Sequence, residues 1–145
     1  DEDVSEQIRT EKVGKLASNI ATFSNLRAEV LDLQRGFRKA PGLVADGRDM
    51  GTVVFPDAEV KFFLEASAEA RAHRRYIELK NKGFDVRLPL LLEEILERDA
   101  RDRERSVAPL RPADDSILID SSQLSAFEVT EVAFITLEKL GIFRE

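Results

Sequence analysis

Apolar residues in positions 4–39 recur every three, four or five residues, a spacing typical of helices that bury one face. The pattern loosens at residues 22–24, so we expect the helical stretch to break there. The apolar positions that form the pattern are Ile8, Val13, Leu16, Ile20, Phe23, Leu26, Val30, Leu33 and Phe37.

Three short apolar runs predict β-strands at residues 42–46, 60–65 and 116–120. Each run is almost entirely apolar, which is typical of strands buried on both faces of a parallel sheet. Serine caps and glycine stops delimit the helices expected around them. These helices cover residues 68–82, between Ser67 and Gly83, residues 90–106, and residues 126–140, between Ser125 and Gly141.

Strands that alternate with helices predict an α/β fold with a parallel sheet flanked by helices. Ligands of such sheets bind at the carboxyl ends of the strands. Polar residues follow all three predicted strands, at residues 46–49, at Glu65 and at residues 120–122, and we expect them to line one crevice. Residues 81–87 separate two charged helices and predict the tip of a helical hairpin that closes over a substrate.

Composition narrows the class of ligand. The chain has 145 residues, 43% of them hydrophobic, which is enough for the core of one domain. Its net charge of −6 disfavours a nucleic acid polymer as partner, yet 15 of its 22 basic residues are arginine, the cation best suited to phosphate. No cysteine is present and no apolar run nears the roughly 20 residues of a membrane span, so we expect a cytoplasmic protein with no membrane partner.

The loop sequence DGRDMG at residues 46–51 is the first candidate site. Asp46, at the end of a predicted strand, is placed to reach a magnesium ion directly or through water. Gly47 permits a tight turn, and Arg48 then projects into the crevice with a guanidinium able to fork onto phosphate. The alternative is an ordinary polar loop that contains an Asp–Arg pair.

The charged run at residues 98–105 is the second candidate. Helical spacing puts Arg98, Asp102 and Arg105 on one face. Two guanidinium groups beside a carboxylate suit a phosphorylated sugar, because the arginines bind phosphate oxygens and the carboxylate accepts a ribose hydroxyl. The alternative is a solvated helix with i,i+4 ion pairs worth only about 0.2–0.5 kcal/mol each.

A third cluster contains Arg71, Arg74 and Arg75, of which the first and last are i,i+4 neighbours able to clamp a polyphosphate. The adjacent His73 receives no role. The pattern GxxxxGK followed by Ser or Thr, which cradles ATP phosphates, does not occur in the 145 residues.

Residues 5–13 (SEQIRTEKV), 42–67 (GLVADGRDMGTVVFPDAEVKFFLEAS) and 97–122 (ERDARDRERSVAPLRPADDSILIDSS) together resemble bacterial cytidylate kinase. The resemblance covers nearly the whole chain in order. It implies a P-loop nucleoside monophosphate kinase fold with a five-stranded parallel sheet. It also implies an enzyme that transfers the γ-phosphoryl group of ATP to CMP or dCMP with Mg²⁺. We expect the intact protein to be a monomer.

The resemblance also implies roles for individual residues, with Asp102 facing the ribose. Four positions on the ATP and magnesium side, Arg71, Arg74, Arg75 and Asp46, are assigned more loosely. On the CMP side, Ser18, Arg27 and Asp49 match positions that read cytosine, Arg48 and Arg105 match arginines that hold phosphate, and Arg98 matches a residue near sugar and phosphate.

Family members begin with a strand and a phosphate-binding loop, whereas this sequence starts after both. We therefore expect a C-terminal portion with an incomplete sheet, inactive as a 145-residue piece. The expected divisions are residues 1–40, a helical part of the monophosphate-binding region with its connection to the core; 41–70, core strands; 71–105, a helical lid; and 106–145, the last core strand and helix.

Two other functions are compatible with the residues. A CMP-binding module without catalysis would bind CMP and not ATP. A helical RNA-associated protein would use the arginines of residues 98–105, but the negative net charge and the single tyrosine, with no tryptophan, leave little for base stacking.

Overall fold

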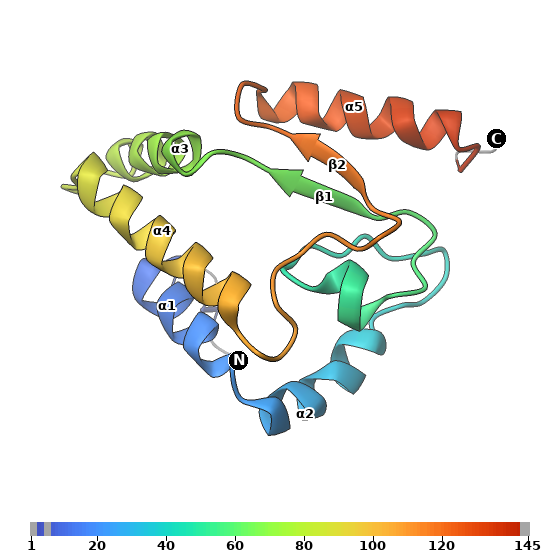
Figure 1. The fold of residues 1–145 in the computed structure, drawn as a ribbon. Coiled ribbons are helices and arrows are strands. Elements are labelled where there is room, and N and C mark those ends of the chain that lie inside the picture. The colour runs from blue at the N-terminus through green and yellow to red at the C-terminus, as the bar shows by residue number, and fades with distance from the viewer. Residues whose placement is uncertain (1–2, 5–6, 143–145) are drawn as a thin grey trace. The chain divides into compact units, whose positions relative to one another are not determined.

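The structure is a computed structural model that describes residues 3–4 and 7–142 (Figure 1). The chain divides into two units, each assembled from two separate stretches of sequence. Unit 1 comprises Asp1–Pro56 and Glu97–Arg111, and unit 2 comprises Asp57–Leu96 and Pro112–Glu145. The elements in chain order are η1 (Gln7–Arg9), α1 (Glu11–Ile20), α2 (Ser24–Arg35), η2 (Met50–Val54), β1 (Phe62–Glu65), α3 (Ala68–Asn81), α4 (Leu88–Glu104), β2 (Ile117–Asp120) and α5 (Ala126–Lys139).

Unit 1 contains α1, α2, the single π-helical turn η2 and the C-terminal half of α4. The predicted break in the first helical stretch is confirmed, because α1 ends at Ile20 and α2 begins at Ser24. After α4 the chain turns back on itself, and the Leu110 N–H donates to the Asp102 carbonyl at 2.7 Å. Ala108 lies in this turn with φ +49°, a left-handed conformation that is uncommon for a residue other than glycine.

Unit 2 is organised around a parallel pair of strands. Phe62 of β1 pairs with Ile117 of β2, and the register runs on to Glu65 and Asp120. Helix α5 follows β2 and runs back alongside it (Figure 1). The strands predicted at residues 60–65 and 116–120 are thereby confirmed, as is the meeting of Glu65 and Asp120 at their carboxyl ends.

The strand predicted at residues 42–46 is wrong. These residues form no regular element, and the Val44 side chain is fully exposed. A strand is stable only when a neighbour pairs its backbone, and the sheet of the described residues has two strands, which pair with each other. The described residues therefore do not form the five-stranded sheet that the resemblance implied.

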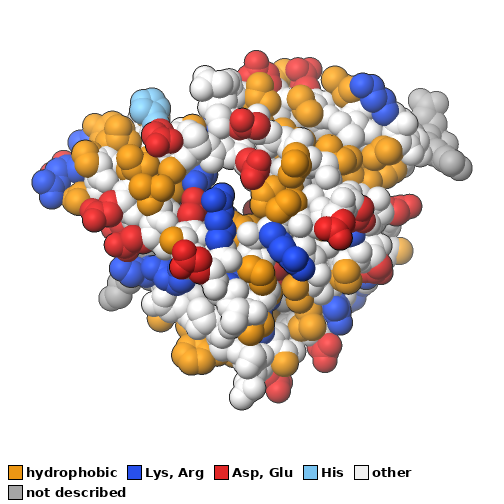
Figure 2. Space-filling view, viewed as in Figure 1, with side chains coloured by type: hydrophobic (Ala, Val, Ile, Leu, Met, Phe, Trp, Pro, Cys, Tyr) orange, Lys and Arg blue, Asp and Glu red, His pale blue; other side chains and the backbone are white. Residues whose placement is uncertain are grey.

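The cores of the two units are small. Only Val54, Phe55, Ala72, Leu91 and Ile119 are buried among the described apolar side chains. Large apolar side chains such as Leu64, Leu118 and Phe127 are more than half exposed. Figure 2 shows apolar side chains at the surface over α3 and α5. No helix formed by residues 3–4 and 7–142 is both long and apolar enough to cross a membrane.

Polar caps fix the helix ends where the sequence predicted them. The Ser67 hydroxyl accepts from the Ala70 N–H at 3.1 Å at the start of α3. At α5, Ser125 and Glu128 form a reciprocal capping box, and the hydrogen bonds that Ser125 donates lower the pKa of the Glu128 carboxyl. Gly83 and Gly141 follow α3 and α5 with φ +82° and +70°, conformations that favour glycine.

Replacing Ser67 by alanine should lower the free energy of unfolding by about 1 kcal/mol, because the Ala70 N–H loses its acceptor. Ser67→Asp is the matched control, since a carboxylate also accepts at this position. Urea unfolding followed by circular dichroism measures both. Equal stability of the alanine and aspartate variants would contradict the cap.

The Lys61–Asp115 pair should make stability depend on acid pH. The Lys61 ammonium, whose side chain is 8% exposed, donates to Asp115 Oδ1 and Oδ2 at 2.9 and 2.7 Å, and these hydrogen bonds lower the pKa of the Asp115 carboxyl. A lowered folded-state pKa gives stability that is present above the ordinary aspartate pKa of about 3.9 and is lost as pH falls through the folded-state pKa.

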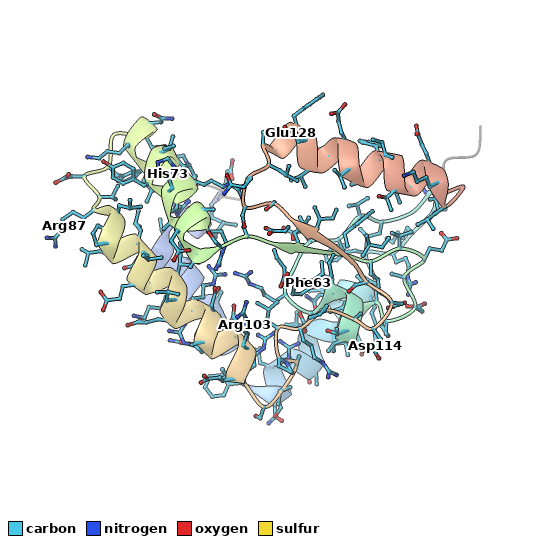
Figure 3. The ribbon with its side chains drawn as sticks, turned by 45° about the horizontal axis from the view of Figure 1, so that its top comes forward. Phe63, His73, Arg87, Arg103, Asp114 and Glu128 are labelled. Carbon is cyan, nitrogen blue, oxygen red and sulfur yellow. The ribbon has the colours of Figure 1, made fainter. Side chains whose placement is uncertain are left out.

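Asp115→Asn should therefore remove part of the acid-range decline in the urea midpoint. Asp114→Asn is the control, because the Asp114 side chain (Figure 3) makes no hydrogen bond or ion pair within the described part of the chain. An unchanged pH profile in Asp115→Asn, or the same change in both variants, would contradict this assignment.

Candidate functional site

The candidate site lies within unit 1, around the carboxylate of Asp102. This residue on α4 is 2% exposed. The Ser18 hydroxyl of α1 donates to Asp102 Oδ1 at 3.0 Å. Arg48 Nε lies 3.3 Å from Oδ2, and Arg98 Nε lies 3.8 Å from the same oxygen. Three segments far apart in the sequence thus meet at one buried acid.

Each partner of Asp102 has a local structural origin. Arg98 is one turn before Asp102 on the same helix, as the predicted helical face required. Ser18 lies in the last turns of α1 and is itself buried. Arg48 comes from the loop before η2. Because a buried carboxylate costs several kcal/mol unless it is paired, these contacts are what make the position of Asp102 tolerable.

Arg98 in this cluster, and Arg105 just after the end of α4, each have a buried donor without a hydrogen-bond partner in the described residues. Arg105 Nε donates to the Ala108 carbonyl, but the buried Nη2 of Arg105 has no hydrogen-bond partner within the described residues. The buried Nε of Arg98 makes no hydrogen bond there and has only the longer ion pair with Asp102. An unsatisfied buried donor costs about 1–3 kcal/mol, so both groups are suited to receive an anionic oxygen.

A second acid, Asp49, is also buried in unit 1 and pairs with Arg27 of α2. Asp49 immediately precedes the π-helical turn η2, and its backbone carbonyl accepts from the N–H groups of Val53 and Val54 at 2.9 and 3.2 Å. The Arg27–Asp49 pair combines a fork of donors with a carboxylate acceptor. Such a pair can match a base edge that carries both acceptors and a donor.

Gly47 allows the turn between Asp46 and Asp49 to be compact. A Cβ atom at this position would lie 2.8 Å from Met50 Cε and 3.0 Å from Met50 Cγ. Any side chain at residue 47 would therefore require the Met50 side chain to shift, which agrees with the tight turn predicted for residues 46–51.

The arginines predicted for the ATP side lie in unit 2 and already contact their own unit. Arg71 Nε donates to the Ala66 carbonyl at 3.1 Å. Arg74 Nη2 donates to the carbonyls of Ser121 and Leu124, the latter at 3.0 Å. Arg75 pairs with Glu78, and the hydrogen bonds from Lys82 and Arg75 lower the pKa of the Glu78 carboxyl. Their role toward ATP stays a prediction.

Asp46 is exposed and lies in the irregular segment before the turn. Among the residues that the structure describes, no group of three or more His, Cys, Asp or Glu side chains is placed to hold a metal ion. A direct protein cage for magnesium is thus not formed by them. The crevice predicted to join residues 46–49 with Glu65 and residues 120–122 stays a prediction, because these segments belong to different units.

Two residues in unit 1 were missed by the sequence reasoning. Arg101 Nη1 donates to the Ser18 hydroxyl at 3.4 Å, which adds a second arginine of α4, after Arg98, to the cluster. Arg35 donates from Nε and Nη2 to the carbonyls of Val54 and Val53 at 3.0 and 3.1 Å. Arg101 stood inside the charged run already singled out, whereas nothing in the sequence marks Arg35.

Comparison with known proteins identifies the family. The family model described as cytidylate kinase matches residues 1–139. Relatives named "Cytidylate kinase" include one from Aeromonas hydrophila, 63% identical over 128 residues, and one from Methylococcus capsulatus, 61% identical over 138 residues. A third, from Pseudomonas aeruginosa, is 59% identical over 140 residues.

These alignments cover 88%, 95% and 97% of this chain but 56%, 62% and 61% of the respective relatives. The chain thus spans roughly three fifths of the length of the proteins that it matches. The family match and the level of identity show that the chain belongs to the cytidylate kinase family.

Proposed function

We propose that this chain forms the CMP-binding part of a nucleoside monophosphate kinase that transfers the γ-phosphoryl group of ATP to CMP or dCMP. The observation that carries the proposal is the cluster around Asp102, in which a buried carboxylate, a serine and several arginines meet. Arg98 Nε in this cluster and Arg105 Nη2 just after α4 are buried donors without a hydrogen-bond partner in the described residues. A phosphorylated sugar supplies the missing partners, because it offers anionic oxygens and hydroxyl donors together.

Each group has a role that follows from its chemistry. Arg48, Arg98 and Arg105 hold the phosphate of CMP. Asp102 accepts a hydrogen bond from the ribose. For the base, Ser18, Arg27 and Asp49 offer hydroxyl, guanidinium and carboxylate groups, and cytosine presents two acceptors and an amino donor.

Catalysis in this proposal consists of positioning and charge neutralisation, without a covalent intermediate. A phosphate oxygen of CMP forms the new bond to the γ-phosphorus of ATP, the bond to the bridging β,γ-oxygen breaks, and ADP leaves with that electron pair. Arg48, Arg98 and Arg105 neutralise the charge that moves between the phosphates, since guanidinium groups stay protonated. We assign Arg71, Arg74 and Arg75 to the ATP side.

Magnesium fits the proposal through Asp46 alone. Mg²⁺ is commonly bound by one or two carboxylates together with waters and substrate phosphates, so a single exposed acid is an adequate protein contribution. When bound, the ion would reduce the negative charge of the ATP phosphates. Asp46 would hold one of its waters.

A module that binds CMP without catalysis is the second candidate. One observation favours it: the groups assigned to CMP, around Asp102 and in the Arg27–Asp49 pair, lie within unit 1, whereas the arginines assigned to ATP bond to other residues of unit 2. This candidate requires CMP binding without ATP binding. Titration of the protein with each nucleotide distinguishes the two functions.

Arg48→Ala in the full protein should lower kcat/KM for CMP by at least about 100-fold, because one lost transition-state contact commonly costs about 2.7–4 kcal/mol. Arg103→Ala is the matched control, since this arginine of α4 (Figure 3) is exposed and its side chain makes no hydrogen bond or ion pair within the described residues. A coupled assay of ADP release measures both. Wild-type turnover in Arg48→Ala would refute the role of Arg48.

Asp102→Ala should lower kcat/KM for CMP more than for dCMP, because only CMP carries the 2′-hydroxyl that the carboxylate accepts. The same assay with both substrates provides the comparison, and dCMP serves as the internal control for any general loss of structure. Equal losses on both substrates would mean that Asp102 only orients Arg48 and Arg98.

A further inference from the structure

Helix α2 holds the turn η2 at both ends. Near its start, Arg27 pairs with the carboxylate of Asp49, the residue that precedes the turn. At its last residue, Arg35 donates to the final two carbonyls of the turn, from Nη2 to Val53 and from Nε to Val54, at 3.1 and 3.0 Å. One helix therefore contacts both the side chain before η2 and the backbone at its end.

The turn itself links those two contacts. The Asp49 carbonyl accepts from the Val53 and Val54 N–H groups, and the Phe55 N–H donates to the Met50 carbonyl at 2.7 Å. Such π-helical turns are rare and are frequent at functional sites. Because the hydrogen bonds run through the whole turn, a shift of its end is transmitted to Asp49 at its start.

The end of the turn depends on Arg35 for its hydrogen bonds. The last carbonyls of a helix have no partner within the helix. The fork of a guanidinium matches two consecutive carbonyls, and a cation is favoured at this end of the helix dipole. The Val54 side chain is 1% exposed, so the turn is anchored in the core of unit 1 on its other side.

We propose that Arg35 is a positioning residue that fixes the Asp49 carboxylate through η2 and thereby sets the preference for the cytosine base. The inference rests on the proposed function, in which Asp49 and Arg27 read that base. Arg35 touches no substrate in this scheme. It determines where Asp49 lies relative to Arg27.

A purely structural role gives a different result. If Arg35 only capped the turn, its loss would lower stability and reduce activity on every nucleotide by the same factor. If it positions Asp49, its loss selectively raises KM for CMP and narrows the discrimination against UMP, whose base lacks the amino donor. The kcat at saturating CMP then changes little, because the phosphate-binding arginines are untouched.

The experiment compares Arg35→Ala with Lys39→Ala in the full protein. Lys39 is an exposed cation four residues further on, and its side chain makes no hydrogen bond or ion pair within the described residues, so it controls for loss of charge. We expect Arg35→Ala to reduce the ratio of kcat/KM for CMP over UMP by about tenfold. This is smaller than the roughly 100-fold loss in rate that a displacement of about 1 Å can cause. Lys39→Ala should retain the wild-type ratio.

Hydrogen exchange gives a second readout that does not depend on activity. The amides of Val53, Val54 and Phe55 should exchange faster in Arg35→Ala than in the wild type or Lys39→Ala. Arg35→Lys keeps the charge but not the fork and should give an intermediate CMP/UMP ratio. If Arg35→Ala does not fold, the CMP/UMP ratio of Arg35→Lys tests the positioning role instead.

The outcomes separate the two hypotheses. A wild-type protein without preference for CMP would overturn the proposed function and, with it, the base-reading role of Arg35. A wild type that prefers CMP, with an unchanged ratio in the Arg35 variants, would overturn this inference alone. Unchanged amide exchange in Arg35→Ala would also overturn it.

Discussion

The burial of the Asp102 carboxylate is the constraint on which unit 1 depends. An isolated buried charge would cost several kcal/mol, and only paired and hydrogen-bonded charges are stable in such a position. The contacts that compensate for it come from α1, from the loop before η2 and from α4 itself. The same three contacts that stabilise the acid therefore bring a serine hydroxyl and two guanidinium groups together at one point of unit 1.

Much of the local structure could be predicted because it has local causes. Ser67 and Ser125 cap helices through hydrogen bonds within four residues, and Gly83 and Gly141 end them with a left-handed turn. The helical face of Arg98 and Asp102 likewise follows from spacing alone. The strand prediction for residues 42–46 was wrong because an apolar run forms a strand only where another strand is available to pair with it. The composition of the run does not say whether such a partner exists.

Arg35 shows a different limit of sequence reasoning. Its contacts are with backbone carbonyls 18 and 19 residues away, and a carbonyl looks the same in every residue. No pair of side-chain types therefore signals the interaction. The π-helical turn was equally invisible, since a five-residue turn leaves no periodicity to detect. What the sequence indicated at residues 46–51 was a tight polar loop, and the structure adds the helix that holds it.

A cluster of arginines in a sequence can either stabilise the fold or bind a ligand. The acceptors around each guanidinium group in the structure distinguish these two roles. Arg74 donates to two carbonyls that follow β2, so its guanidinium contributes to the structure of unit 2. Arg105 retains a buried Nη2 without a partner in the described residues, which is costly unless a ligand supplies one. In Arg48 and Arg98 the ion pair with Asp102 uses Nε, one of three guanidinium nitrogens. A buried acid thus orients these two guanidinium groups, whereas backbone carbonyls are among the acceptors that orient Arg74.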